Sequence, residues 1–261
     1  MAWVLEANGA VEGSAWLPAP AAALPGAAEV HVWRASLDQA VPRVGALLET
    51  LQPDERERAA RFRFEDDRNR FIAARGILRD ILARALGSTP GAVRFVYGPW
   101  GKPALAEPAA GDLQFNLSHS GGLALYALTC GRAVGIDVER IRPEVMREGI
   151  ARRFFSPREV AALERLPEAE RCAGFFRCWT RKEAYVKATG RGLLLPLDSF
   201  DVSLAPGEPA ALLGTRPDPA EACRWSLMHL EPGNGWVGAL AVEGHGLRLR
   251  CFEWAPADSP A

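Results

Sequence analysis

The chain has 261 residues, of which 48% are hydrophobic and 24% are charged, a balance typical of a globular protein and not of a disordered one. Its 31 lysines and arginines against 32 aspartates and glutamates give a formal net charge of −1, which argues against nucleic acid as a partner. Any anion site must therefore be a local cluster of basic side chains. The length allows one large domain or two halves of about 130 residues each.

The cysteine pattern indicates a reducing compartment. The five cysteines contain no C-x-x-C pair and are odd in number, which argues against a zinc module and against a disulfide framework. Residues 1–9 lack a basic region followed by an apolar one, so we expect no signal peptide. The longest uncharged stretch, residues 13–28, contains three prolines and cannot form a spanning helix. We therefore expect a cytoplasmic protein that does not act at a membrane.

Apolar periodicity predicts two successive halves, each with a long helical region followed by strands. After an irregular lead-in, the first half has a strand at 29–34, helices at 42–51, 53–64 and 66–86, and strands at 93–97, 113–116, 123–129 and 133–139. The second half has a helix from Pro157, marked by the Ser156 cap, a helix at 171–188, and strands at 200–204, 225–230, 236–242 and 247–252.

This order predicts an α+β fold built as a pseudo-two-fold symmetric pair of similar subdomains. Each subdomain would be a long helix packed on a small antiparallel sheet, with the active site in the cleft between them. The predicted division is an N-terminal subdomain at 1–140 with the irregular lead-in at 1–28, a connecting loop at 141–156, a C-terminal subdomain at 157–254 and a tail at 255–261.

The helices at 53–86 form the most basic part of the chain. Their arginines alternate with many acidic residues, so each one is best interpreted as part of a solvated, salt-bridged surface. Gly76 lies in the middle of the second of these helices, where glycine costs about 1 kcal/mol relative to alanine. It would permit a close approach by a ligand or by another helix.

Two polar segments interrupt the strands of the first half. Lys102 lies in a Gly-Lys-Pro loop, and residues 116–122 place Asn, Ser, His and Gly between two apolar strands. A plain hairpin is the favoured interpretation of the second segment, and the Ser118–His119 pair without a third member is a poor sign of a catalytic triad. Amide, hydroxyl and imidazole donors in such a loop would also suit a phosphate group.

Three carboxylates and one ammonium group could converge from two elements. Asp137 and Glu139, two apart on a strand, point to one side of it. Glu183 and Lys187, four apart on a helix, share one helical face. Either pattern alone more often marks a salt-bridged surface. Aromatic residues around Glu183 indicate a buried helix, where charges need a partner or a metal ion, so the sequence suggests a Mg²⁺ site for phosphate oxygens.

Several motifs, in order, resemble those of the Sfp-type 4′-phosphopantetheinyl transferases, the family that activates surfactin synthetase. The resemblance runs from about residue 53 to residue 242. The matching segments are GKP at 101–103, FNLSHS at 115–120, GIDVE at 135–139, RFFS at 153–156, WTRKEAYVK at 179–187, and GL at 192–193 followed by PLDSF at 196–200.

The resemblance implies a monomeric α+β enzyme that binds coenzyme A and Mg²⁺ between its halves, with Mn²⁺ as an alternative ion. It would transfer phosphopantetheine to a serine of an apo acyl or peptidyl carrier protein and release adenosine 3′,5′-bisphosphate. Asp137, Glu139 and Glu183 would hold the metal ion, and Glu183 and Lys187 would be catalytic. The residues expected at coenzyme A are Arg58, Arg70 and Arg75 at the 3′-phosphate, Gly101, Lys102 and Pro103 at the adenine end, Ser118 and His119 at the nucleotide phosphates, and Asp137, Lys182 and Lys187 at the pyrophosphate.

Some alternatives stay open at this point. The base that takes the serine proton is either Glu183 or a metal-bound water, because a bound cation lowers the pKa of a glutamate. The chain could also be a non-catalytic relative that binds carrier protein or nucleotide, or another Mg²⁺-dependent phosphotransferase. A carrier protein would dock at the 141–156 segment, Phe154, Phe155 and residues 193–195.

Overall fold

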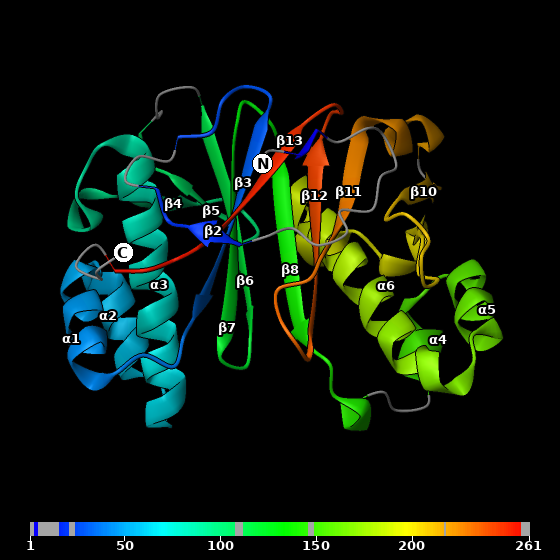
Figure 1. The fold of residues 1–261 in the computed structure, drawn as a ribbon, viewed down its shortest axis with the longest axis horizontal. Helices are drawn as coiled ribbons and strands as arrows, with labels where there is room; N and C mark the ends of the chain where they lie inside the picture. The colour runs from blue at the N-terminus through cyan, green and yellow to red at the C-terminus, as the bar shows by residue number, and fades with distance from the viewer. Residues whose placement is uncertain are drawn as a thin grey trace.

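The computed structural model describes residues 3–4, 16–20, 24–107, 112–145, 149–216 and 218–256. Two sheets meet in the middle of the molecule, and a long helix lies on the outer side of each (Figure 1). The helices are α1 (Val41–Thr50), α2 (Pro53–Ala60), α3 (Glu65–Leu86), α4 (Ile150–Phe154), α5 (Pro157–Arg165) and α6 (Glu168–Thr189), with 3-10 turns η1 (Pro90–Ala92), η2 (Pro143–Val145), η3 (Gly192–Leu194), η4 (Leu197–Ser199) and η5 (Pro219–Arg224). The strands are β1 (Trp3–Val4), β2 (Leu17–Pro18), β3 (Glu29–Ser36), β4 (Phe95–Tyr97), β5 (Pro103–Leu105), β6 (Leu113–Ser120), β7 (Leu123–Cys130), β8 (Val134–Arg140), β9 (Phe200–Val202), β10 (Leu212–Thr215), β11 (Trp225–Leu230), β12 (Trp236–Glu243) and β13 (Arg248–Glu253).

The first sheet carries α3 on its outer face. Its strand order is β1-β13-β3-β7-β6, with β2 also paired to β13. Leucine, isoleucine and alanine side chains of α3 pack against Trp33, Phe115 and Tyr126 of the sheet. Gly76 lets α1 approach α3, because a Cβ built there would lie 2.7 Å from Cβ of Leu47. The expectation of a close approach at this glycine is therefore confirmed, and the neighbour is a helix.

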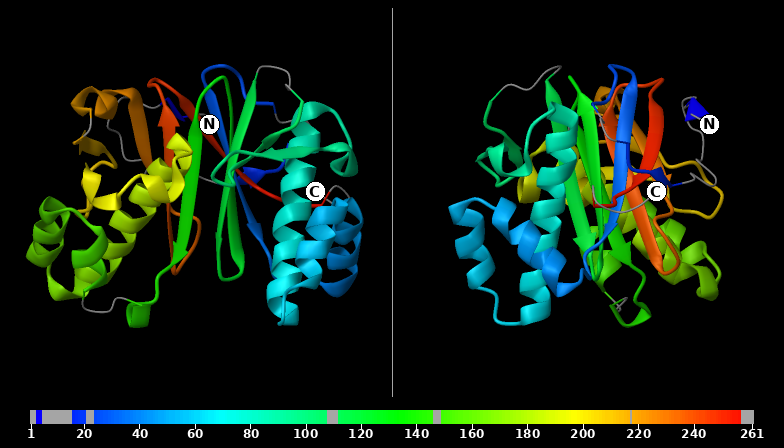
Figure 2. Two further views of the ribbon diagram at one scale, coloured as in Figure 1. Left: turned by 180° about the vertical axis from the view of Figure 1, so that it is seen from behind. Right: turned by 60° about the vertical axis from the view of Figure 1, so that its left-hand side comes forward.

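The second sheet carries α6 on its outer face. Its strand order is β11-β12-β8, all antiparallel, and the small β9–β10 pair lies beyond it with α4 and α5 (Figure 2). Phe175, Phe176, Tyr185 and Phe200 pack between α6 and these strands. Ser156 caps α5 as expected, since its side chain accepts from the Glu159 amide at 3.2 Å. The predicted α+β fold with two helix-on-sheet halves is confirmed.

The division between the halves differs from the predicted boundaries. β8 lies before residue 140 yet pairs with β12 in the second sheet. β13, in the predicted C-terminal subdomain, returns to the first sheet and pairs in parallel with β3. Each predicted half thus contributes one strand to the sheet of the other half. Val32, Leu125, Ile136 and Leu240 belong to a hydrophobic core between the two sheets. Hydrophobic periodicity finds strands but does not identify their partners.

Two segments expected to be irregular contain regular structure, and a third forms the expected hairpin. The described parts of the 1–28 lead-in include β1 and β2, which both pair with β13. The 141–156 segment contains η2 and α4. The polar segment 116–122 forms the hairpin that the sequence favoured, with β6 continuing to Ser120 and only two glycines in the turn to β7. Residues 257–261 of the predicted tail lie outside the described residues.

Polar side chains of β6 join the two sheets. Asn116, Ser118 and Ser120 alternate along β6 and are buried, facing β8. Asn116 Oδ1 accepts from the Ile136 amide at 2.9 Å, and Ser120 Oγ accepts from the Arg140 amide at 3.1 Å. Side chains therefore satisfy amides on the edge of β8, where a neighbouring strand would otherwise do so.

Candidate active site

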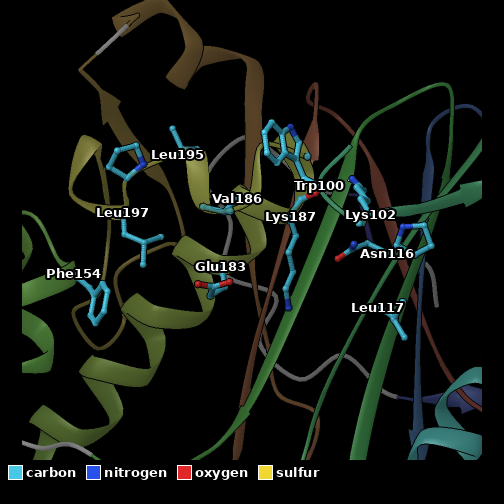
Figure 3. A pocket seen from close by; sticks show the side chains of 15 residues that line it. Trp100, Lys102, Asn116, Leu117, Phe154, Glu183, Val186, Lys187, Leu195 and Leu197 are labelled. Atoms are coloured by element: carbon cyan, nitrogen blue, oxygen red, sulfur yellow. Dashed lines mark hydrogen bonds between the residues drawn. The ribbon is translucent and has the colours of Figure 1, made fainter. Parts of the chain in front are cut away.

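A cavity of about 440 Å³ opens where the two halves meet. Figure 3 shows Glu183 and Lys187 projecting from α6, with Asn116 and Leu117 of β6 opposite them. The lining residues are Trp100, Gly101, Lys102, Pro103, Asn116, Leu117, Phe154, Glu183, Val186, Lys187, Gly190, Gly192, Leu195, Pro196 and Leu197. The cleft expected between the halves is therefore present, and it has an apolar end and a charged end.

Asp137 is buried behind the charged end of the cavity, where it contacts the lining residue Lys187. Asp137 is 3% exposed, and its Oδ1 accepts from Lys187 Nζ at 2.6 Å and from Ser118 Oγ at 2.8 Å. Among the residues that the structure describes, its buried Oδ2 has no hydrogen-bond partner. Burial raises the pKa of Asp137, while Lys187 and Ser118 oppose that rise. A buried carboxylate oxygen without a hydrogen bond needs a partner, so Asp137 Oδ2 is suited to bind a cation or a hydrogen-bond donor.

Glu139 and Glu183 lie on either side of Asp137. Glu139, half-buried on β8, accepts from Ser120 Oγ at 2.7 Å. Burial raises the pKa of Glu139, and the charge of Asp137 raises it further. Burial also raises the pKa of Glu183 on α6, followed by repulsion from Asp137 and Glu139. The charge of Asp137 therefore raises the pKa of both Glu139 and Glu183, whereas the ammonium group of Lys187 lowers the pKa of both.

This donor set fits a hard divalent cation. Three carboxylates with one ammonium leave an excess of negative charge, and Asp137 Oδ2 is a buried oxygen to which no side chain or amide of the described residues donates. The side chains nevertheless do not close around one point: in the described part of the chain, no group of three or more His, Cys, Asp or Glu is close enough to hold a metal ion. Lys187 occupies Asp137 Oδ1, and Ser120 holds Glu139.

Lys102 ties the first half to the end of α6. Its Nζ donates to the carbonyls of Lys187 at 2.8 Å, Val134 at 3.0 Å and Ala188 at 3.3 Å. Burial lowers the pKa of Lys102 to about 8. The ammonium therefore closes the C-terminal turn of α6, and the residue lines the cavity beside Gly101 and Pro103. The family resemblance predicts this side chain at the adenine end of coenzyme A, whereas in the structure its ammonium group is held by three backbone carbonyls.

His119 and Ser118 lie on opposite faces of β6, because side chains alternate along a strand. Ser118 is buried at Asp137, whereas His119 is exposed. Partial desolvation lowers the pKa of His119, and the nearby charges of Lys187 and Arg58 lower it further. Arg58 and Lys187 are thus positive charges near a neutral His119 imidazole, which is compatible with the expected phosphate contacts.

Other residues expected to contact coenzyme A have different partners. Lys182 is fully buried and donates to Glu159 Oε1 at 2.6 Å and to the Phe200 carbonyl at 2.8 Å, so it cannot reach the cleft. Arg75 is buried and donates to Glu55 Oε1 at 2.6 Å.

Arg70, half-exposed, is paired with Asp38 Oδ1 at 2.8 Å, and this hydrogen bond raises the pKa of Arg70. Residues that motif reading did not single out as site residues also lie here: Asn116 and Ser120, whose alternation with apolar neighbours was the available signal.

Two family models match the chain. Residues 133–241 match the 4′-phosphopantetheinyl transferase superfamily, and residues 33–130 match the 4′-phosphopantetheinyl transferase, N-terminal, family. A curated relative, the 4′-phosphopantetheinyl transferase HetI of Nostoc sp. (strain PCC 7120), is 47% identical over 92% of this chain and 98% of its own length. The chain belongs to the 4′-phosphopantetheinyl transferase superfamily.

A second relative of this transferase is the 4′-phosphopantetheinyl transferase Sfp of Bacillus subtilis (strain 168), which is 32% identical over 70% of this chain and 79% of its own length. The expected family is therefore confirmed, with HetI more similar than Sfp. A solved structure titled Chronobacterium ammoniagenes ACPS-CoA complex is 19% identical, with a TM-score of 0.35, over 44% of this chain and 98% of that one. None of the described helices is long and apolar enough to cross a membrane.

Proposed function

We propose that this transferase moves the 4′-phosphopantetheine group of coenzyme A onto a serine of an apo acyl or peptidyl carrier protein. Adenosine 3′,5′-bisphosphate would be the released product, and a divalent cation, Mg²⁺ or in its place Mn²⁺, would be required. The observation that carries the proposal is the pair of Asp137 with Lys187, which lines the inter-half cavity together with Glu183, and the nearby charge of Glu139. The family match supports the same chemistry.

The metal ion would be held by Asp137, Glu139 and Glu183. When bound, it supplies positive charge to the pyrophosphate oxygens as the leaving phosphate becomes more negative. Asp137 Oδ2 already lacks a protein partner among the described residues, and Oδ1 would keep only its hydrogen bond from Ser118 if Lys187 Nζ turned toward the substrate. Ser118 and Ser120 fix two of the carboxylates from β6.

Lys187 has two roles in this proposal. In the structure it neutralises Asp137, and its half-buried side chain lines the cavity. With coenzyme A present, the same ammonium would contact a pyrophosphate oxygen, since a lysine is a mobile point charge on a flexible stem. The positive charges of Arg58 and Lys187 would attract the remaining phosphate oxygens, and the neutral His119 imidazole would donate a hydrogen bond to one of them.

Either Glu183, which lines the cavity, or a metal-bound water would take the serine proton. Burial and the adjacent carboxylates raise the pKa of Glu183 in the metal-free protein, and a bound cation would lower it. The carrier would approach over the apolar end of the cavity. There Trp100 is 56% exposed and Leu194 is 62% exposed, and Phe154 lines the opening. Phe155, expected at this surface, is buried instead.

Incubation with coenzyme A, Mg²⁺ and several apo carrier proteins, followed by intact-mass analysis, tests the function. We expect a phosphopantetheine adduct with the native chain and none with Asp137→Asn or Glu183→Gln. The matched control is Glu164→Gln, which removes an exposed carboxylate paired with Arg152. Absence of an adduct on every carrier would refute the proposed transfer, and an active Asp137→Asn enzyme would refute the metal assignment.

A further inference from the structure

The ammonium group of Lys102 is bonded to two elements of the second half at the same time. Lys102 belongs to a tight turn of the first half, in which the Gly98 amide donates to the Lys102 carbonyl at 2.9 Å. From this turn, Lys102 Nζ donates to the Val134 carbonyl on β8 and to the Lys187 and Ala188 carbonyls at the end of α6. One side chain therefore joins the first half to both β8 and α6.

This ammonium group has no donor left for a ligand. A lysine ammonium carries three N–H donors, and Lys102 Nζ has three carbonyl acceptors within 3.3 Å. The stem of the side chain lies against the end of the helix, since a Cβ built on Gly190 would be 3.8 Å from Cδ of Lys102. Contact of the ammonium with a nucleotide would require at least one of the three hydrogen bonds to break. Although Lys102 lines the cavity, its charge is therefore used within the protein.

The end of α6 is closed differently from the end of α3. Both helices have 22 residues and are followed by a left-handed glycine, Gly87 after α3 and Gly190 after α6. At α3, the Gly87 and Ser88 amides both donate to the Ala83 carbonyl. The Gly190 amide makes no comparable hydrogen bond within the described residues, and Lys102 bonds the last carbonyls of α6 instead. A cation is also the favoured partner of a helix C-terminus.

The helix end that Lys102 holds carries the charged side chains of the cavity. Lys187 Nζ reaches from α6 to Asp137 Oδ1 on β8 at 2.6 Å, and Glu183 lies one turn earlier on α6. A movement of α6 relative to β8 would change the Lys187–Asp137 contact and the position of Glu183 together. Because Lys102 bonds Val134 of β8 as well as α6, it fixes the two elements relative to each other.

We propose, building on the proposed transferase function, that Lys102 is a positioning residue: it holds α6 on β8 in the arrangement that transfer requires, and its ammonium does not bind coenzyme A. The family resemblance predicts a contact with the nucleotide instead. The two roles have different kinetic consequences. Loss of a positioning residue lowers kcat, because the reacting groups of the bound complex are misplaced, whereas loss of a nucleotide contact weakens nucleotide binding.

Kinetics and nucleotide binding separate the two roles in the full-length enzyme. Lys102→Met removes the ammonium and keeps an unbranched apolar stem. We expect kcat for carrier-protein modification to fall about 10- to 100-fold, since a misplacement of about 1 Å can lower a rate about 100-fold. The Kd of adenosine 3′,5′-bisphosphate, measured by calorimetry with Mg²⁺ present, should change less than about twofold. Both measurements are made at a temperature at which thermal unfolding shows the variant to be folded.

Arg84→Gln is the matched control. It removes a cation from the last turn of α3, where Arg84 Nη2 donates to the Ala255 carbonyl at 2.8 Å, and should leave kcat and Kd unchanged. If Lys102→Met does not fold, Lys102→Gln, which keeps an uncharged donor, replaces it with the same expected changes.

A native kcat in the folded Lys102 variant would overturn the inference. A Kd for adenosine 3′,5′-bisphosphate that rises as much as kcat/KM falls would assign Lys102 to the nucleotide, and would overturn it too. In both cases the native enzyme still modifies its carrier, so the proposed transfer stands. Absence of an adduct with the native chain would refute the proposed transfer and this inference together.

Discussion

The substitution Gly135→Ala tests whether close packing of α6 on β8 sets the geometry of the transfer site. A Cβ built on Gly135 would lie 2.9 Å from Cα of Ala188, and closer still to the Ala184 carbonyl oxygen and the Ala188 amide nitrogen. These are backbone atoms of α6, so no side chain can rotate away to relieve the contact. Since ordinary contacts begin at 3.4 Å, α6 must move away from β8 by about 1 Å.

The cost of this movement should appear mainly in catalysis. Overpacking of a core costs about 1–3 kcal/mol of unfolding free energy, which a protein of this size tolerates. Glu183 and Lys187 sit next to Ala184 and Ala188 on α6, so they move together with the helix. A misplacement of about 1 Å can lower the rate of a positioned reaction about 100-fold. We therefore expect a variant that is folded but about 100-fold less active.

The assay is kcat/KM for carrier-protein modification, measured beside thermal unfolding. Gly45→Ala in α1 is the control, because a Cβ there meets nothing within 4 Å and alanine favours a helix by about 1 kcal/mol. It should keep full activity and unfold at the same or a higher temperature. A Gly135→Ala enzyme with native kcat/KM would show that α6 placement does not limit catalysis, and the reasoning from packing would be wrong.

Three further predictions concern side-chain contacts. Glu159→Leu and Lys182→Met, each made alone, should lower the free energy of unfolding by about 3–5 kcal/mol, because each leaves an unpaired buried charge. In denaturant unfolding, the double variant should lose less free energy of unfolding than the sum of the two single losses, and additive losses would contradict the pairing. Ser118→Ala should weaken Mg²⁺ binding about 10- to 100-fold in calorimetry by freeing Asp137, whereas unchanged affinity would contradict a supporting role. Burial lowers the pKa of Lys102 from 10.5 to about 8, so between pH 8 and pH 10.5 the folded chain binds fewer protons at this site than the unfolded chain does. The free energy of unfolding of the native chain, relative to that of Lys102→Met, should therefore rise with pH across this window. A fall would contradict the burial argument.

Local patterns in the sequence predicted the elements that carry the transfer site. The two-residue spacing of Asp137 and Glu139 places both at β6 on one side of β8, as their bonds to Ser118 and Ser120 show. Helical periodicity located α6 within three residues at its start. These signals are local, since they depend on neighbours within one strand or one turn, and such neighbours are visible in a single sequence.

The partners of buried charges could not be predicted in the same way. Glu55 accepts from both Arg75 and Arg79, which lie 20 and 24 residues away on another helix. The interleaved charges at 53–86 suggested a solvated surface, and only the fold shows that this carboxylate is buried between two arginines. Lys182 is a comparable case. Its side chain lies on the helical face that Cys178 shares and contacts α5 and β9, whereas its neighbour Glu183 lies on the face that lines the cleft.

The polar hairpin segment at 116–122 explains why the candidate site lies between the two sheets. Asn116 and Ser120 bond the Ile136 and Arg140 amides of β8 through side chains, which hold two strands farther apart than backbone pairing at about 4.8 Å would. A paired strand at this edge would leave no room for acidic side chains between β6 and β8. Because side chains form the contacts instead, Asp137 can point into the gap and keep its Oδ2 without a protein partner among the described residues. The polar alternation of β6 is therefore the feature that leaves room for acidic side chains at the junction of the two sheets.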